Sequence, residues 1–139
     1  MTNKKDRFPM SAKTSFGFED LLVEELGKVG AINLKKGTRI VHFEGDLETM
    51  YRANLYSRLA LRILKPIKTF PAGNEQQLYD EIKKIDWSEY LTENDTLAVD
   101  AVTSYSTLTH TLYISLKTKD AIVDQFREKT GVRPNVDLR

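Results

Sequence analysis

Apolar and polar residues alternate along the first half of the chain with two different periods, one typical of strands and the other of helices. Strands are expected at residues 8–15, 31–34, 38–43 and 58–68. Helices are expected between them, at residues 18–29 and from Asp46, whose carboxylate suits an N-cap, to Leu55. The resulting order is β-α-β-β-α-β, which predicts a ferredoxin-like fold, an antiparallel sheet with two helices on one face.

The same spacing predicts which residues of each element face the core. In the first helix these are Phe18, Leu21, Leu22, Leu26 and Val29, and in the second they are Leu47, Met50, Tyr51, Asn54 and Leu55. In the last strand, alternation places Leu59, Leu61, Ile63 and Ile67 on one face and Arg58, Ala60, Arg62, Leu64, Pro66 and Lys68 on the other. Pro66 indicates either an edge strand or the last residues of the strand, because proline has no N–H to donate to a neighbour.

The second half of the chain has longer helical periods and fewer strands. Asn74, followed three residues later by Gln77, resembles a capping box and predicts a helix with Leu78, Ile82 and Ile85 buried. A strand is expected at 97–103, and residues 135–139 resemble the start of another. A long helix is expected at 108–129, with Leu112, Leu116, Val123 and Phe126 on its buried side and Gly131 at its end. We therefore expect an α+β chain with a ferredoxin-like domain at residues 1–70 and a second domain, truncated at its C-terminal end, at residues 71–139.

The formal net charge hides an uneven distribution of basic residues. The chain has 139 residues, with 21 Lys and Arg against 20 Asp and Glu. Residues 49–74 contain no acidic residue but five basic ones, Arg52, Arg58, Arg62, Lys65 and Lys68. Such a segment attracts anionic partners, although the pattern equally fits a solvated face whose acidic neighbours lie close in space.

Several classes of site are excluded by composition. The absence of cysteine excludes disulfides and thiol chemistry, His42 and His110 have no second metal ligand at suitable spacing, and no glycine-rich phosphate loop occurs. The polar start lacks a signal-peptide core, and no apolar run approaches the roughly 20 residues that span a bilayer. The sequence therefore predicts a cytoplasmic protein with no membrane partner, no metal and no catalytic residue, one that binds rather than catalyses.

Basic residues in two places are the candidate binding residues. Arg58, Arg62 and Lys68 share one face of the predicted strand, and Lys117 and Lys119 lie on the long helix. The helix also carries a polar stripe, Tyr113, Lys117, Asp120 and Asp124, at three- and four-residue spacing. Each set could equally be a solvated surface, and Arg58 and Arg62 could pair with acids of the first helix. The basic face carries no aromatic residue, which argues against base stacking on the sheet.

Three segments in fixed order carry a resemblance to a known family. "GFEDLLVEEL", "MYRANLYSRLALRIL" and "KDAIVDQFRE" resemble the N-terminal half of bacterial THUMP-domain methyltransferases that modify guanine N2 in 23S ribosomal RNA, often labelled N6-adenine-specific DNA methylases. The resemblance implies a ferredoxin-like domain followed by a THUMP domain, the RNA-binding region of that family. Its members continue into a Rossmann-type domain that binds S-adenosylmethionine, and the motifs of that domain do not occur in this sequence.

Two hypotheses of function follow from the resemblance and the charge pattern. In the first, the chain binds RNA, in the family large-subunit ribosomal RNA, through Arg58, Arg62, Lys68, Lys117 and Lys119, with catalysis and S-adenosylmethionine left to a C-terminal methyltransferase domain. In the second, the same surface docks on that methyltransferase domain or on a partner protein, without direct contact to RNA.

Overall fold

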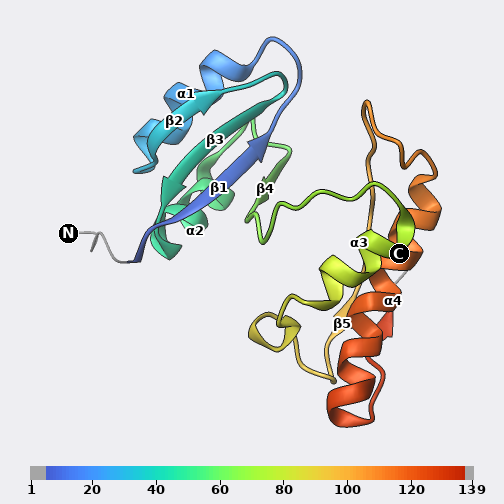
Figure 1. Cartoon of the computed structure of the whole chain (residues 1–139). Helices are drawn as coiled ribbons and strands as arrows, with labels where there is room; N and C mark the ends of the chain where they lie inside the picture. The colour runs from blue at the N-terminus through green and yellow to red at the C-terminus, as the bar shows by residue number, and fades with distance from the viewer. Residues whose placement is uncertain (1–5, 137–139) are drawn as a thin grey trace. The chain divides into compact units, whose positions relative to one another are not determined.

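The computed structural model describes residues 6–136 and divides between Thr69 and Phe70 into two compact units. We call them the N-terminal unit and the C-terminal unit and describe each by itself (Figure 1). No helix within residues 6–136 is long and apolar enough to cross a lipid bilayer.

The N-terminal unit has the predicted order of elements. These are β1 (Phe8–Lys13), α1 (Glu19–Lys28), β2 (Ile32–Lys36), β3 (Ile40–Gly45), α2 (Leu47–Tyr56) and β4 (Arg62–Leu64). The strands form one sheet in the order β2-β3-β1-β4, and every neighbouring pair is antiparallel. The predicted ferredoxin-like arrangement is confirmed, and β4 lies at the edge of the sheet.

Both helices of this unit cover the same face of the sheet (Figure 1). The core consists of alternate residues of β1 and β3 together with Leu22 and Leu26 of α1 and Ala53 of α2; the strand residues are Met10, Ala12, Val41 and Phe43. Residues that alternate with these strand positions lie on the opposite face, which we call the open sheet face.

The predicted buried stripe of α2 is largely wrong, and Met50 alone of its five residues packs against the core. Leu47, Tyr51 and Leu55 are exposed, whereas Thr49 and Ala53 are buried. Small side chains face the sheet because the chain passes directly from β3 into α2: a Cβ at Gly45 would lie 2.6 Å from the Cβ of Thr49. The hydrophobic pattern therefore identified the helix but assigned most of its large side chains to the wrong face. The predicted cap is confirmed, since the Asp46 carboxylate accepts from the Thr49 N–H at 2.9 Å.

The stripe of α1 is only partly as predicted. Leu22 and Leu26 are buried, but Phe18 and Leu21 are exposed. The first turn instead buries Glu19, whose carboxylate accepts hydrogen bonds from backbone N–H groups rather than facing solvent.

The predicted strand at 58–68 is much shorter in the structure. Pairing with β1 covers only Arg62–Leu64. Residues 57–60, before the paired segment, form a turn in which the Ser57 hydroxyl accepts a hydrogen bond from the Ala60 N–H at 3.0 Å. The Thr14 hydroxyl donates to the Leu59 carbonyl of this turn at 2.9 Å. After it, Pro66 has no N–H for a ladder. Leu61 and Ile67, predicted to be on the buried face, are exposed.

The C-terminal unit is built mainly from two helices. Its elements are α3 (Glu75–Lys83), a short 3-10 helix η2 (Trp87–Glu89), β5 (Thr96–Leu97), α4 (Thr111–Thr130) and β6 (Asn135–Val136), with β5 and β6 parallel. Leu78 and Ile82 of α3 pack against the second half of α4, where Ala121, Ile122, Val123 and Phe126 are buried. Asn74 caps α3 by accepting from the Gln77 N–H at 2.8 Å, and Gly131 ends α4 in the left-handed conformation, both as predicted.

Two predictions in this unit are wrong. The strand expected at 97–103 is limited to Thr96–Leu97, and Val102 is 91% exposed, because residues 98–103 have no partner strand among residues 6–136. The long helix begins at Thr111 rather than at about residue 108. Of its predicted buried side, Leu112 and Leu116 are exposed, whereas Val123 and Phe126 are buried as predicted. Residues 137–139 of the predicted final strand lie outside the described part of the chain.

Candidate nucleic-acid interface

The open sheet face carries cations in neighbouring positions. Strand register places Lys13 of β1 directly opposite Arg62 of β4, and Lys35 of β2 opposite His42 of β3. Ile63, next to Arg62, packs on the helix-covered side, so Arg62 lies on the open side. Lys13, Lys35 and Arg62 are exposed, and none of the three forms an ion pair with another described residue. Cations without acidic partners are available to an anion.

A polar pair lies in the middle of the open sheet face. The Ser11 hydroxyl and Nδ1 of His42 are 2.8 Å apart, and Ser11 is almost completely buried. A shallow hollow of about 490 Å³ lies over this pair and extends to Lys35 and Glu44. The Asn33 amide donates to Glu44, which satisfies the one carboxylate on this part of the face. This end of the face is therefore polar, while the end with Lys13 and Arg62 is cationic.

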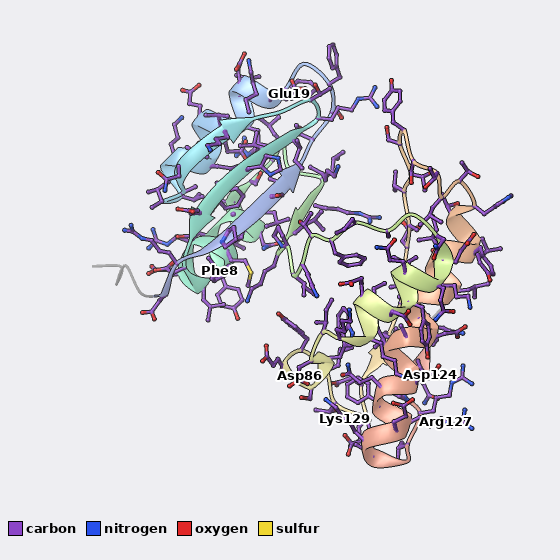
Figure 2. The ribbon with its side chains drawn as sticks, viewed as in Figure 1. Phe8, Glu19, Asp86, Asp124, Arg127 and Lys129 are labelled. Carbon is purple, nitrogen blue, oxygen red and sulfur yellow. The ribbon has the colours of Figure 1, made fainter. Side chains whose placement is uncertain are left out.

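The turn next to Lys13 is held by a buried carboxylate. Glu19 at the start of α1 accepts from the Gly17 N–H at 2.8 Å and from the Arg39 N–H at 3.0 Å (Figure 2). These hydrogen bonds, the one from Arg39 first, hold the pKa of the Glu19 carboxyl below its ordinary value. The Arg39 carbonyl in turn accepts from the Thr14 N–H at 3.0 Å. Glu19 thus fixes the β2–β3 turn beside the end of β1 that carries Lys13.

The structure separates the basic residues of the 49–74 segment. Arg62 joins the open sheet face, but Lys65 lies over the Phe8 ring, 4.5 Å from its centroid, and Arg52 pairs with Glu48 on α2 at 2.8 Å. Arg58 is exposed in the turn after α2, where its backbone N–H donates to Glu25, and Lys68 lies in the segment after β4. The grouping of Arg58, Arg62 and Lys68 on one strand face is therefore wrong, because only Arg62 is in a strand.

In the C-terminal unit, Lys117 lies between two tyrosines. Its ammonium is 5.8 Å from the ring centroids of both Tyr79 and Tyr113. The Tyr79 hydroxyl donates a hydrogen bond at 2.6 Å to Asp124, which lies on α4 (Figure 2). This hydrogen bond is the main reason that the pKa of Tyr79 is raised. Three residues of the predicted polar stripe, Tyr113, Lys117 and Asp124, are thus linked through a tyrosine of α3 that the sequence pattern did not include.

Lys119 does not belong to that cluster. It pairs with Asp120 at 2.8 Å, and its side chain is only 18% exposed. Two residues along a helix correspond to about 200° of rotation, so Lys117 and Lys119 point to different sides of α4. Lys119 instead lines a separate hollow with Leu116 and Arg133.

Sequence reasoning missed Lys13 and Lys35, which the structure places beside Arg62 and His42. Both lie outside the acid-free segment, and only the register of four strands brings them to this face. Lys13 could have been found from the alternation of residues in β1: because Met10 and Ala12 point inward, Lys13 must lie on the opposite face. Among residues 6–136 no group of three His, Asp or Glu side chains is arranged to hold a metal ion. The arrangement as described can bind an anion through unpaired cations.

Comparison with known proteins identifies both units. Residues 9–64 match the RlmL ferredoxin-like domain and residues 72–139 match the THUMP domain. A ribosomal RNA large subunit methyltransferase K/L from Methylococcus capsulatus is 44% identical over 138 residues, which are 99% of this chain and 18% of that relative.

Two solved structures have the same fold over nearly the whole chain. A predicted N6-adenine-specific DNA methylase from Listeria monocytogenes has a TM-score of 0.81 and 30% identity, covering 90% of this chain and 33% of that one. SMU.472, in complex with SAH, has a TM-score of 0.81 and 27% identity, covering 94% and 36%. The chain thus spans about a fifth of the curated relative and about a third of each solved chain. The expected pair of a ferredoxin-like and a THUMP domain is confirmed.

Proposed function

The chain belongs to the RlmL ferredoxin-like domain family over residues 9–64 and to the THUMP domain family over residues 72–139, and from this we propose that it is the RNA-binding region of a methyltransferase that acts on large-subunit ribosomal RNA. The observation that carries the proposal is the THUMP match together with relatives named as ribosomal RNA methyltransferases. Such an enzyme works in the cytoplasm, where ribosomal RNA is made and assembled in bacteria.

The electrostatics of the open sheet face support RNA as the ligand. Lys13 and Arg62 lie opposite each other at one end of the sheet and have no acidic partner among the described residues. Each contact between a cation and a phosphate releases counterions and adds to affinity, whatever the base sequence. Lys117, held between Tyr79 and Tyr113, offers a further cation in the C-terminal unit.

We assign phosphate binding to Lys13, Arg62 and Lys117. Arg58 and Lys68 stay as further candidates, since both are exposed, and Lys119 is the weakest because Asp120 already neutralises it.

Methyl transfer belongs outside these two domains. S-adenosylmethionine is usually held at a glycine-rich turn between a parallel strand and a helix, and residues 6–136 contain an antiparallel sheet and one two-residue parallel pair. The residues described do not fit the cofactor. We therefore propose that a methyltransferase domain of the longer protein binds it, and that this domain and RNA are the two partners of the chain.

Charge reversal on the open sheet face tests the proposal. We expect the chain to bind a structured fragment of large-subunit ribosomal RNA in low salt, and Lys13→Glu/Arg62→Glu to weaken binding at least tenfold, because two attractive contacts become repulsive. Lys28→Glu/Lys36→Glu is the matched control, with the same change of charge on side chains that already pair with Glu24 and Asp20. Fluorescence anisotropy measures both affinities. If both double variants lose the same amount of RNA affinity, the net charge of the chain, and not the open sheet face, determines binding. If the wild-type chain does not bind RNA, a domain-docking role is favoured instead.

A further inference from the structure

The outer surface of α2 exposes large side chains that a helix usually buries. Leu47, Tyr51, Leu55 and Tyr56 are 55%, 65%, 73% and 63% exposed. On the side that faces the sheet, Thr49 and Ala53 are buried and Met50 is partly buried against the core. A cluster of exposed apolar and aromatic side chains of this kind marks a binding surface.

Three of these four residues, together with Glu48 and Arg52, enclose a shallow hollow. Its volume is about 610 Å³, and it is lined by Glu48, Tyr51, Arg52, Leu55 and Tyr56. Two aromatic rings and an aliphatic side chain thus border one space. An aromatic ring offers a flat surface to any nucleobase, because every base has a π-face.

The polar groups of the hollow suit the edge of a base better than a phosphate. Glu48 and Arg52 form an ion pair of 2.8 Å, so the hollow holds no net charge of its own. Both side chains are more than half exposed, and such a pair is weak enough to exchange partners. The carboxylate can accept from an exocyclic amino group, and the guanidinium can donate to a ring nitrogen or carbonyl oxygen.

The surroundings of the hollow favour a polyanion over an apolar protein partner. Arg58 follows Tyr56 by two residues, is exposed and forms no ion pair within the described part of the chain. A cation next to a stacking surface is the combination that proteins use for single-stranded nucleic acid.

We infer that the hollow on α2 binds an unpaired RNA base, with Tyr51 or Tyr56 stacking on it and Arg58 contacting its phosphate. The inference rests on the proposed RNA-binding function and adds the substrate class: RNA with an unpaired nucleotide next to structured regions. This site is separate from the open sheet face, because α2 covers the opposite face of the sheet.

Binding of two matched RNAs by the full chain tests the inference. One probe is a short labelled strand without self-complementarity, and the other is the same strand in a blunt-ended duplex. We expect Tyr51→Ala/Tyr56→Ala to weaken binding of the single strand about tenfold or more and to change binding of the duplex less than about twofold. Tyr51→Phe/Tyr56→Phe keeps both rings and should retain the affinity. Leu47→Ala is the control, since it removes an exposed apolar side chain of the same helix that does not line the hollow.

Each other outcome overturns the inference in a recognisable way. The hollow is not a base site if the alanine variant binds the single strand as tightly as the wild type does, or if its affinity falls equally for the single strand and the duplex. The proposed function stands in both cases. If the wild-type chain binds neither probe, the proposed function fails as well. Sedimentation of the same variants detects the alternative occupant: self-association that disappears in the alanine variant with RNA binding unchanged would make this surface a contact between copies.

Discussion

The cores of the two units are built from different kinds of elements. In the N-terminal unit a four-stranded sheet carries two helices, and the buried residues come from β1, β3 and both helices. In the C-terminal unit, α3 packs on the second half of α4, and the only strands within residues 70–136 are two residues long. The first unit depends on strand register, whereas the second depends on a contact between two helices that are separated by residues 84–110, which hold only η2 and β5 as regular elements.

Removing one core phenylalanine from each unit should give the largest effect and should sharpen the comparison. Phe43 and Phe126 are both almost completely buried, in separate clusters. We expect Phe43→Ala and Phe126→Ala each to cost about 3–5 kcal/mol of stability, from lost burial and the cavity left behind. Hydrogen exchange followed by mass spectrometry should show the loss of protection in the unit that carries the substitution. Equal loss across both units would contradict two separate cores.

Gln125 is the polar centre of the C-terminal unit and should give the next largest effect. Its side chain accepts from the Trp87 N–H at 3.0 Å and donates to the carbonyls of Lys83 and Ile85, which ties the end of α3 and η2 to α4. Gln125→Ala leaves three backbone groups without a partner, so we expect a loss of about 2–3 kcal/mol in the free energy of unfolding. Urea denaturation followed by the fluorescence of Trp87 measures it. Gln76→Ala, on the exposed side of α3, should change stability by less than about 0.5 kcal/mol.

The cap of α3 should contribute less. Asn74→Ala removes the acceptor for the Gln77 N–H and should cost about 1 kcal/mol, and Asn74→Asp, which keeps an acceptor, should restore most of it. Both variants can be compared by the midpoint of urea denaturation. If Asn74→Asp is as unstable as Asn74→Ala, the hydrogen bond is not the source of the stability.

Glu19 should give the N-terminal unit a specific sensitivity to acid. Its pKa is lower in the folded protein than its ordinary value of 4.5, so its contribution is complete above that value and is lost as the pH falls below it toward the folded pKa. Glu19→Gln should therefore destabilise the unit at neutral pH and flatten the dependence of its stability on pH below 4.5. Thermal melts of the two proteins between neutral pH and acid test this. Parallel pH profiles would show that Glu19 titrates normally.

The sequence alone predicted those features that depend on residues close together in the chain, namely the helices and their caps. Spacing of apolar residues located α1, α2, α3 and α4, and the capping residues Asp46, Asn74 and Gly131 are in the structure as predicted. Faces of helices were predicted less well. In α2, Met50 packs on the core as predicted, but Thr49 and Ala53 are the buried residues, whereas periodicity favours the larger Leu47, Tyr51 and Leu55.

The candidate site depended on information that periodicity does not contain. Arg62 was predicted, but Lys13, which lies opposite it, comes from a distant strand and meets it only through register, as Lys35 meets His42. The long strand at 58–68, which grouped Arg58 and Lys68 with Arg62, is interrupted by a turn and by Pro66. In the same way Lys117 and Lys119 are close in sequence but separate on the helix, since one meets Tyr79 and the other Asp120.

The dependence of RNA affinity on salt tests the central claim most directly. If phosphates are bound by cations of both units, the logarithm of the association constant should fall linearly with the logarithm of salt concentration, and Lys13→Glu/Arg62→Glu should reduce that slope by about two. The Lys28→Glu/Lys36→Glu control should leave the slope as it is in the wild type. A slope that is the same in all three proteins would contradict the account, because Lys13 and Arg62 would then make no contact with the RNA.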